Sequence, residues 1–314
     1  MNKKILLILL VLGVFLVSAC TQQTPTSNSG YLGGQKGLEI KFLQGAPPES
    51  ISDGGEQDFD IVVEVQNNGE HFVEANEAYI KLSGFPPTSF GMTNADLIQN
   101  LTEDVEANEK QPDGTTITSP PVSVEFPGFN YEANETTSRD FPVRAEICYK
   151  YQTEAAAELC VKEEFTSTAK DGVCDVNSQR DMSTSGGPVQ ITNLKQTAAG
   201  KDKTRFTFTV SNVDTGKIYK TDNYCDDKLT NQNKVFVEIL DLAYGSQDAI
   251  KCVGLSEGSD SSGYVTLSGG EPRDVSCTVT LTDRNNRIEP FNIRLTYDYW
   301  KYVDTTIMVQ HTPE

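Results

Sequence analysis

Alternation of apolar and polar residues recurs from residue 38 to residue 310 and constrains the fold more than any other feature of the sequence. Successive side chains of a strand point to opposite faces, so this alternation predicts strands with one buried face. Gly, Pro, Asn and Asp separate the alternating segments, which favours antiparallel strands and an all-β fold. The expected strands cover residues 38–42, 59–65, 80–82, 122–126, 141–151, 159–165, 189–191, 206–210, 235–239, 264–267, 275–281, 291–297 and 306–310.

The same order of strands occurs twice along the chain. Residues 141–149 (FPVRAEICY) line up with residues 291–299 (FNIRLTYDY). Upstream, VQNNG at residues 65–69 matches VSNVDTG at residues 210–216. Similar segments in the same order predict an internal duplication. Each copy contains about seven short strands, which fits an antiparallel sandwich of two sheets better than a helical or parallel fold.

The pattern of a Val-x-Val strand followed by Asn and Gly, with a Tyr-rich hairpin at the end, is similar to the Ig-like extracellular modules of the CARDB kind in archaeal and bacterial surface proteins. The resemblance spans residues 38–310. It implies two tandem antiparallel Ig-like β-sandwiches, at residues 38–170 and 171–314, and it implies a fold rather than a function. The chain departs from the Cys, Trp, Cys arrangement of antibody domains, because Trp300 lies in the last hairpin.

The amino-terminal segment predicts export. Lys3 and Lys4 precede a thirteen-residue apolar run, which is shorter than the roughly 20 residues that a membrane-spanning helix needs. We therefore expect a signal peptide at residues 1–19, in helical form, that is removed. Small residues before Cys20 also fit an ordinary secretory signal with an incidental cysteine. Residues 20–37 are rich in Thr, Gln, Ser and Gly and predict a flexible linker, with the folded part beginning near Gly37.

The sequence Val17-Ser-Ala-Cys20 resembles the lipobox of bacterial-type lipoproteins, which some archaea also use. The resemblance implies cleavage before Cys20 and attachment of a diacylglyceryl group to its sulfur. It also implies a protein held at the cell envelope surface, with the membrane as its partner through this lipid.

Six cysteines remain after Cys20, and an even number in an exported chain predicts three disulfides. Cys148 and Cys160 lie symmetrically about Glu154, so a hairpin there would place them opposite each other. Cys252 and Cys277 each lie near a predicted strand, which favours their pairing, and Cys174 with Cys225 follows by elimination. A zinc site is the competing interpretation, but there is no C-x-x-C and there are only two His.

The chain carries a net charge of −19 and has no cluster of basic residues, which excludes nucleic acid as a partner. Most of the negative charge lies in residues 38–170, where the net charge is −17 against −5 in residues 171–314. We expect no metal centre, because neither group of neighbouring acids has the spacing of an EF-hand loop. Calcium binding remains the alternative, with candidate ligands Asp53, Glu56, Asp58 and Asp60, or Asp222, Asp226 and Asp227.

The segment between Pro86 and Pro121 is the longest expected loop. Residues 94–105 within it carry Leu97, Ile98, Leu101 and Val105 on one face at helical spacing, with Thr93 or Asn94 as the cap, which predicts one amphipathic helix. The loop could close the edge of the sandwich as a lid or serve as a recognition loop. Two N-x-T sequons, at Asn100 and Asn134, are candidate glycosylation sites in predicted loops.

The motifs of catalysis are weak. His71 lies in a predicted turn and His311 near the end, neither well placed as a catalytic base. Gly254-x-Ser-x-Gly258 lacks the strand–turn–helix context of a nucleophile elbow, and Ser167-x-x-Lys170 lacks a K-T-G partner. We therefore expect no enzyme and no cofactor, but a lipid-anchored surface protein of structural or adhesive type. Its contacts, with a surface protein or a glycan, would use exposed strand edges and the loop before Pro121.

Two alternatives stay open at this point. One is a carbohydrate- or calcium-binding envelope lipoprotein. The other is an envelope hydrolase that uses a pair of carboxylates, because the separation of two acidic side chains cannot be read from a sequence.

Overall fold

The computed structural model describes residues 30–167, 173–240, 242, 250–282 and 284–312. Within these residues the chain forms strands and short 3₁₀ turns, without an α-helix. Residues from Tyr31 onward make one compact unit. The expected all-β antiparallel fold is confirmed. The predicted signal peptide and Cys20 lie outside the described residues.

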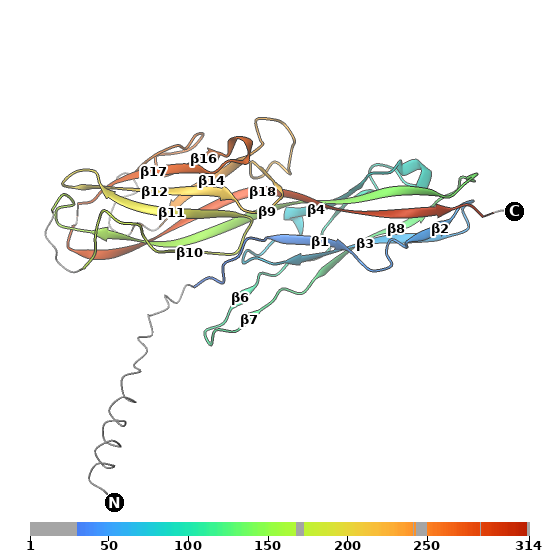
Figure 1. Cartoon of the computed structure of the whole chain (residues 1–314), viewed down its shortest axis with the longest axis horizontal. Coiled ribbons are helices and arrows are strands. Elements are labelled where there is room, and N and C mark those ends of the chain that lie inside the picture. Colours follow the sequence, from blue (N-terminus) through green and yellow to red (C-terminus); the bar gives the residue numbers. More distant parts are fainter. Residues whose placement is uncertain (1–29, 168–172, 241, 243–249, 283, 313–314) are drawn as a thin grey trace, which may run out of the picture. The chain divides into compact units, whose positions relative to one another are not determined.

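Two long strands form the spine of this unit (Figure 1). Strand β9 (Arg139–Val161) and strand β18 (Arg287–Gln310) pair antiparallel along their whole length, from Arg139 opposite Val309 to Val161 opposite Arg287. The predicted hairpin at Glu154 is therefore wrong. The physical reason is visible in the sequence, because residues 143–161 contain no Gly, Pro, Asn or Asp that would turn the chain.

The long strands are the centre of a nine-stranded sheet. Across it the order is β16 (Ser262–Thr266), β14 (Lys234–Leu240), β18, β9, β4 (Ala78–Ser83) and β5 (Ile98–Asn100). Three short strands complete it: β2 (Ser50–Ser52), β10 (Met182–Thr184) and β13 (Lys217–Tyr219). All its pairings are antiparallel except that of β2 with the end of β18.

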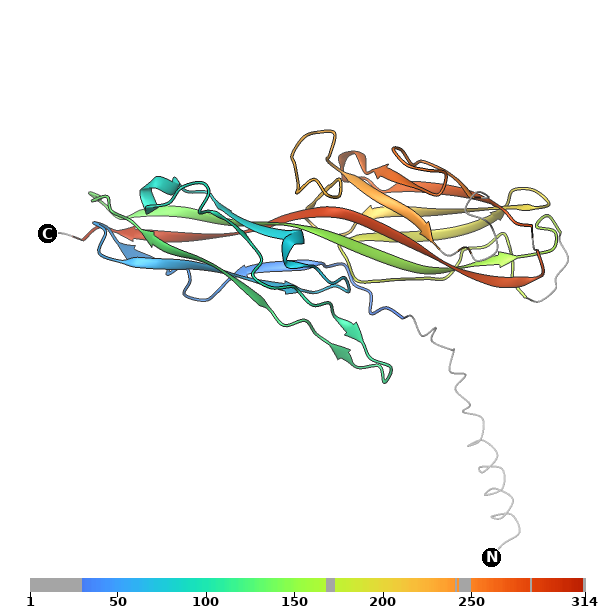
Figure 2. The ribbon, with the colours of Figure 1, turned by 180° about the vertical axis from the view of Figure 1, so that it is seen from behind.

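Two smaller sheets pack against the nine-stranded sheet, one along each half of the long ladder (Figure 2). The first consists of β1 (Leu38–Phe42), β3 (Asp58–Asn67) and β8 (Val122–Asn130). The second consists of β11 (Val189–Ala198), β12 (Lys203–Asn212), β17 (Arg273–Thr280) and β15 (Ile250–Val253). A separate hairpin joins β6 (Glu109–Lys110) and β7 (Thr116–Ile117).

Apolar side chains fill the space between the layers. Phe59 and Ile61 of β3 face Val143 of β9 and Ile307 of β18. In the other half the ring centroids of Phe206 and Phe291 lie 5.0 Å apart. Alternation along each strand thus places every second side chain in one continuous core.

The order of strands supports an internal duplication. Strands β4 and β5 flank β9 as β14 and β16 flank β18, and β1-β3-β8 corresponds to β11-β12-β17. Each long strand, however, pairs with strands from both copies: β9 with β4 and β10, and β18 with β14 and β2. The predicted boundary between residues 170 and 171 consequently does not divide the sheets.

The predicted helix at residues 94–105 is wrong. Strand β5 occupies its centre and pairs with β4, while the Asp96 carboxylate accepts the N–H and the hydroxyl of Thr93 in a turn. Leu97, Leu101 and Val105 are buried as the spacing suggested, but Ile98 is 47% exposed. Pairing at the edge of the sheet satisfies these backbone groups in place of helical hydrogen bonds.

The disulfides differ in part from the expected set. Cys252 is bonded to Cys277, as predicted from their neighbouring strands. Cys148 is bonded to Cys225, and Cys160 to Cys174. The Cys148–Cys160 and Cys174–Cys225 pairings were both wrong, because β9 runs straight and keeps Cys148 and Cys160 at a distance along one strand.

Candidate interaction site

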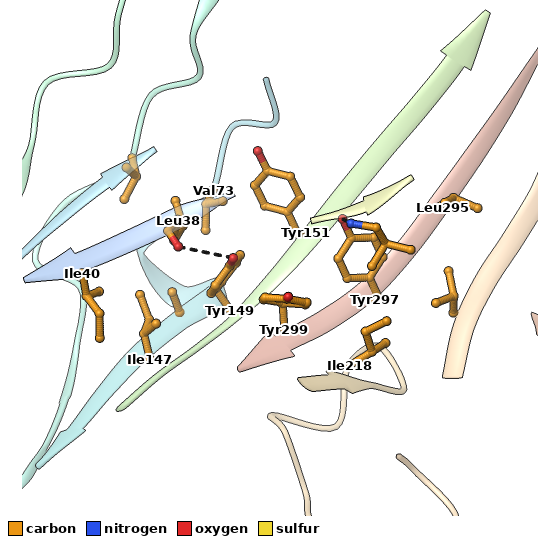
Figure 3. Close-up of a cluster of buried hydrophobic side chains, with 14 of the residues drawn as sticks. Leu38, Ile40, Val73, Ile147, Tyr149, Tyr151, Ile218, Leu295, Tyr297 and Tyr299 are labelled. Atoms are coloured by element: carbon orange, nitrogen blue, oxygen red, sulfur yellow. Dashed lines mark hydrogen bonds between the residues drawn. The ribbon is translucent and has the colours of Figure 1, made fainter. Parts of the chain in front are cut away.

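Four tyrosines occupy the middle of the long ladder (Figure 3). Tyr149 pairs across the strands with Tyr299, and Tyr151 with Tyr297, and all four are fully buried. Burial raises the pKa of each hydroxyl, so all four stay protonated and need hydrogen-bond partners.

Each hydroxyl finds a partner. Tyr149 donates to the carbonyl oxygen of Leu38 at 3.4 Å (Figure 3). The Tyr297 hydroxyl lies 2.9 Å from Oγ1 of Thr153 and accepts the N–H of Val189. The tyrosines thereby tie the spine to the first strand of each smaller sheet.

The two remaining hydroxyls reveal how the copies correspond. Tyr151 donates to Oδ1 of Asn67 at 3.2 Å, and Tyr299 donates to Oδ1 of Asn212 at 3.1 Å. Asn67 and Asn212 each begin a turn that ends at a glycine, at residues 67–69 in the first copy and 212–216 in the second. These two turns are here called the Asn–Gly turns. Tyr151 therefore corresponds to Tyr299, which corrects the sequence alignment of Tyr149 with Tyr299.

On the opposite face of the ladder lies a cavity of about 200 Å³. Cys148 and Lys150 alternate with the buried tyrosines and point to this side, and Asp298 is the cross-strand partner of Lys150. The loop at residues 220–233, between β13 and β14, closes over it through the Cys148–Cys225 disulfide. The full lining is Glu74, Asn76, Glu77, Cys148, Lys150, Asp222, Tyr224 and Asp298.

Asp298 holds this loop through hydrogen bonds to the loop backbone. Its side chain is buried, and the carboxylate accepts the N–H groups of Asp222 at 3.2 Å and Asn223 at 3.0 Å. Burial raises the pKa of Asp298 to about 6, against the opposing effect of those donors. Lys150 pairs instead with Asp222 at 2.9 Å and with Glu77 at 3.5 Å.

The loop is held in an unusual backbone conformation. Asp222, Tyr224 and Cys225 have φ values of 61°, 50° and 52°. Non-glycine residues rarely adopt this left-handed region unless surrounding contacts enforce it. Here the disulfide, the Asp298 carboxylate and a hydrogen bond from the Tyr79 hydroxyl to the Tyr224 carbonyl supply those contacts.

This rigid loop exposes apolar side chains. Tyr224 is 68% exposed and Leu229 is 86% exposed. The first copy has no counterpart, because a short link joins Asn67 to β4 whereas a much longer one joins Asn212 to β14. An inserted, braced loop with exposed apolar residues beside an acidic cavity suits recognition of a partner.

The candidate calcium ligands are engaged in separate contacts. Asp53 accepts the N–H groups of Glu135 and Thr312, each at 2.9 Å, which lowers the pKa of Asp53 to about 2. Asp58 and Asp60 hold Asn130 and Gly128. In the other group, Asp226 pairs with Lys228, and Asp227 accepts the Tyr219 hydroxyl. The described residues contain no group of three acidic, His or Cys side chains that could hold a metal ion.

The remaining candidates are placed as follows. Asn100 and Asn134 are both exposed. His71 packs edge-on against Tyr151, and His311 lies 3.2 Å from Asp53, so the two histidines belong to different contacts. Ser256 lies in an irregular segment that bridges to Tyr264, without a following helix. Lys170 lies outside the described residues.

Sequence reasoning named three aspartates of the loop at residues 220–233, but only as candidate calcium ligands. It missed Asp298 and the exposed Tyr224 and Leu229. The signal that could have found the loop is the unequal length of the two links that follow the Asn–Gly turns. Asp298 itself could not be singled out, because its burial depends on a loop that folds back from another strand.

The architecture defines an all-β protein of layered antiparallel sheets with three disulfides, which indicates folding in an oxidising compartment outside the cytosol. No described helix is long and apolar enough to span a membrane.

No family model and no curated protein matches the chain. Among solved structures, the envelope protein VP37 from White Spot Syndrome Virus is similar over 48% of this chain and 98% of that chain, at 8% sequence identity and a TM-score of 0.24. A likeness this slight carries no argument about fold or function.

Proposed function

We propose that the protein is a lipid-anchored surface protein of adhesive or structural type that makes its contact through the loop at residues 220–233. In this proposal Cys20 carries the lipid, each half of the long ladder with its smaller sheet acts as an Ig-like sandwich, and the partner is another surface protein. The single observation that carries it is the exposure of Tyr224 and Leu229 on a loop held by a disulfide and a buried carboxylate.

Rigidity is the physical reason for favouring contact. An ordered loop loses little conformational entropy on binding, so its exposed aromatic and aliphatic surface is available as binding free energy. Tyrosine is among the residues that contribute most at protein interfaces. The loop therefore has the properties of a preformed contact surface.

A glycan is the second partner class to weigh. Trp300 and Tyr302 lie on the outer face of the ladder with ring centroids 5.3 Å apart and ring planes tilted by 44°, so these two rings are the candidate surface for a stacked sugar. However, Lys217 lies 4.9 Å from the Trp300 ring centre and Arg144 lies 3.9 Å from the Tyr302 ring centre. These cations cover ring faces that a sugar would need, so a protein partner is favoured.

Photocrosslinking on intact cells tests this proposal. A benzophenone amino acid replaces Tyr224 or Leu229 in the full-length protein, and Lys251, an exposed residue of β15, serves as the matched control. We expect a discrete protein adduct from positions 224 and 229 and none from 251. Adducts that are equal at all three positions, or lacking at 224 and 229, would contradict the proposed contact.

Cell fractionation tests the anchor separately. Cys20→Ser should move the protein from the membrane pellet to the soluble fraction, because a diacylglyceryl group cannot form on serine. Persistence of the variant in the pellet after an alkaline wash would contradict lipid attachment at Cys20.

A further inference from the structure

The residues just before β1 are part of the folded body. The segment Tyr31–Gly37, here called the N-terminal strap, was expected to belong to the flexible linker. Instead the N–H groups of Leu32 and Gly33 donate to the Glu70 carboxylate at 2.7 and 2.8 Å. The carbonyl oxygen of Gly34 accepts the N–H of Gly187 at 3.3 Å and the amide of Gln190 at 3.1 Å.

Glu70 is the centre of this arrangement. Besides the two strap donors, its carboxylate accepts the N–H of Gly186 at 2.6 Å. Its own backbone N–H donates to the carbonyl oxygen of Gly186 at 3.1 Å. One side chain from the first copy therefore binds the strap and the segment before β11 of the second copy at once. Charge-assisted hydrogen bonds of this kind are roughly twice as strong as neutral ones.

The far end of the strap reaches the second Asn–Gly turn. Lys36 forms an ion pair with Asp214 at 2.6 Å, and the Asp214 side chain is almost fully buried and also pairs with Lys301 at 2.9 Å. The Gly37 carbonyl oxygen accepts the N–H of Asn68 at 2.9 Å. The strap is thus held from both copies, across the place where the two smaller sheets meet the tyrosines.

We propose that the N-terminal strap is a locking element, held by Glu70, that fixes the exit of the membrane tether at the junction of the two copies. This inference rests on the proposed lipid at Cys20. Only residues 21–30 would then lie between the lipidated Cys20 and the fixed exit point. Fully extended, about ten residues span at most roughly 35 Å, so the junction stays within that distance of the membrane surface.

Cleavage at Lys36 reports on the opening of the strap. Its side chain is half exposed, so trypsin can reach it, but its backbone is docked between bonded neighbours. A protease needs the segment around the cleaved bond to detach, and the cleavage rate then follows the population of the detached state. Cleavage after Lys36 in the folded protein consequently measures how often the strap opens.

Trypsin treatment of the full-length protein in membranes tests the lock, with the new amino terminus at Gly37 quantified by mass spectrometry. Glu70→Ala should speed this cleavage by about tenfold or more, since a loss of about one charged hydrogen bond already corresponds to that factor. Glu103→Ala, at an exposed glutamate outside the strap contacts, should cleave at the wild-type rate.

A second variant separates the strap from the rest of the body. Leu32→Pro removes one strap donor and leaves the Glu70–Gly186 bonds intact, so it should also cleave faster while melting near the wild-type temperature. Rapid cleavage of the wild type, or unchanged cleavage in both variants, would overturn the proposal. Failure of the lipid anchor would appear differently, as soluble protein before trypsin is added.

Discussion

Asp298 is a buried titratable residue and His71 a partly buried one, and they lie on opposite faces of the β9–β18 ladder. Burial lowers the pKa of His71 from 6.5 to about 4 and raises the pKa of Asp298 from 3.8 to about 6. As the pH falls from 6.5 to 4, the unfolded histidine takes up a proton that the native one refuses, so its contribution to stability is lost. Over pH 6 to 3.8 native Asp298 takes up a proton that the unfolded chain does not, so stability is gained. Each shift corresponds to about 3 kcal/mol at most, and the two effects have opposite signs.

Replacing His71 removes the histidine's contribution to the pH dependence of stability. His71→Phe keeps the edge-on contact with Tyr151 but cannot bind a proton. Relative to wild type, the variant should gain about 2–3 kcal/mol in the free energy of unfolding when the pH is lowered from 6.5 to 4. Urea unfolding at several pH values measures this difference. Parallel pH curves for the two proteins would show that the native histidine titrates normally.

Asp298→Asn should reveal the opposite slope. The asparagine cannot take up a proton, so the variant lacks the stabilisation that wild type gains between pH 6 and 4. Its unfolding free energy should therefore fall more steeply on acidification than that of wild type. The same urea series checks this, and a variant that follows the wild-type curve would contradict a raised pKa at Asp298.

At the scale of elements, the two Asn–Gly turns require glycine because other atoms crowd them. A Cβ at Gly69 would collide with the Tyr151 hydroxyl and the Lys36 carbonyl oxygen, and one at Gly216 with the Tyr299 ring and the Trp300 carbonyl oxygen. Alanine at Gly69 or Gly216 should each cost about 2 kcal/mol or more in unfolding free energy. Gly200→Ala, where the nearest atom lies 3.7 Å away, is the control and should change stability little. Thermal melts compare the three, and equal effects would contradict the packing of the turns.

The Cys148–Cys225 disulfide joins strand β9 to the loop at residues 220–233. Non-reducing peptide mapping should recover Cys148 with Cys225, Cys160 with Cys174 and Cys252 with Cys277. Replacing Cys148 and Cys225 together by alanine should lower the free energy of unfolding by about 2–4 kcal/mol, because the bond closes a long loop in the unfolded chain. A peptide that joins Cys148 to Cys160 would contradict the straight course of β9.

Much of the strand content could be predicted from the sequence, because alternation is a local signal that each strand carries itself. The Cys252–Cys277 pairing followed from the same signal. The helix predicted at residues 94–105 was wrong. Leu97 and Leu101 are buried on either side of the edge strand β5, and apolar residues at helical spacing do not distinguish such a strand from a helix. The hairpin predicted at Glu154 was wrong as well. It was inferred from the symmetric positions of Cys148 and Cys160, although residues 143–161 contain no residue that favours a turn.

At the scale of the molecule, the copies share their longest strands. Strands β9 and β18 pass from one half of the ladder to the other, and the tyrosines, the cavity and the Glu70 contacts all lie where the halves meet. The duplication was readable from the repeated Asn–Gly turns. Which strands pair across the copies could not be predicted from the sequence, because pairing is non-local and neither strand alone carries a signal for it. The loop at residues 220–233 is signalled in the sequence only by the unequal length of the links that follow Asn67 and Asn212. The strap could not be assigned beforehand, because its contacts depend on that pairing.

Differential scanning calorimetry of the disulfide-intact protein tests this shared architecture most directly. Because neither half keeps a complete sheet without the long strands of the other, we expect one cooperative transition with equal calorimetric and van't Hoff enthalpies. Two separate transitions, each with about half of the total enthalpy, would show two independent domains and contradict it.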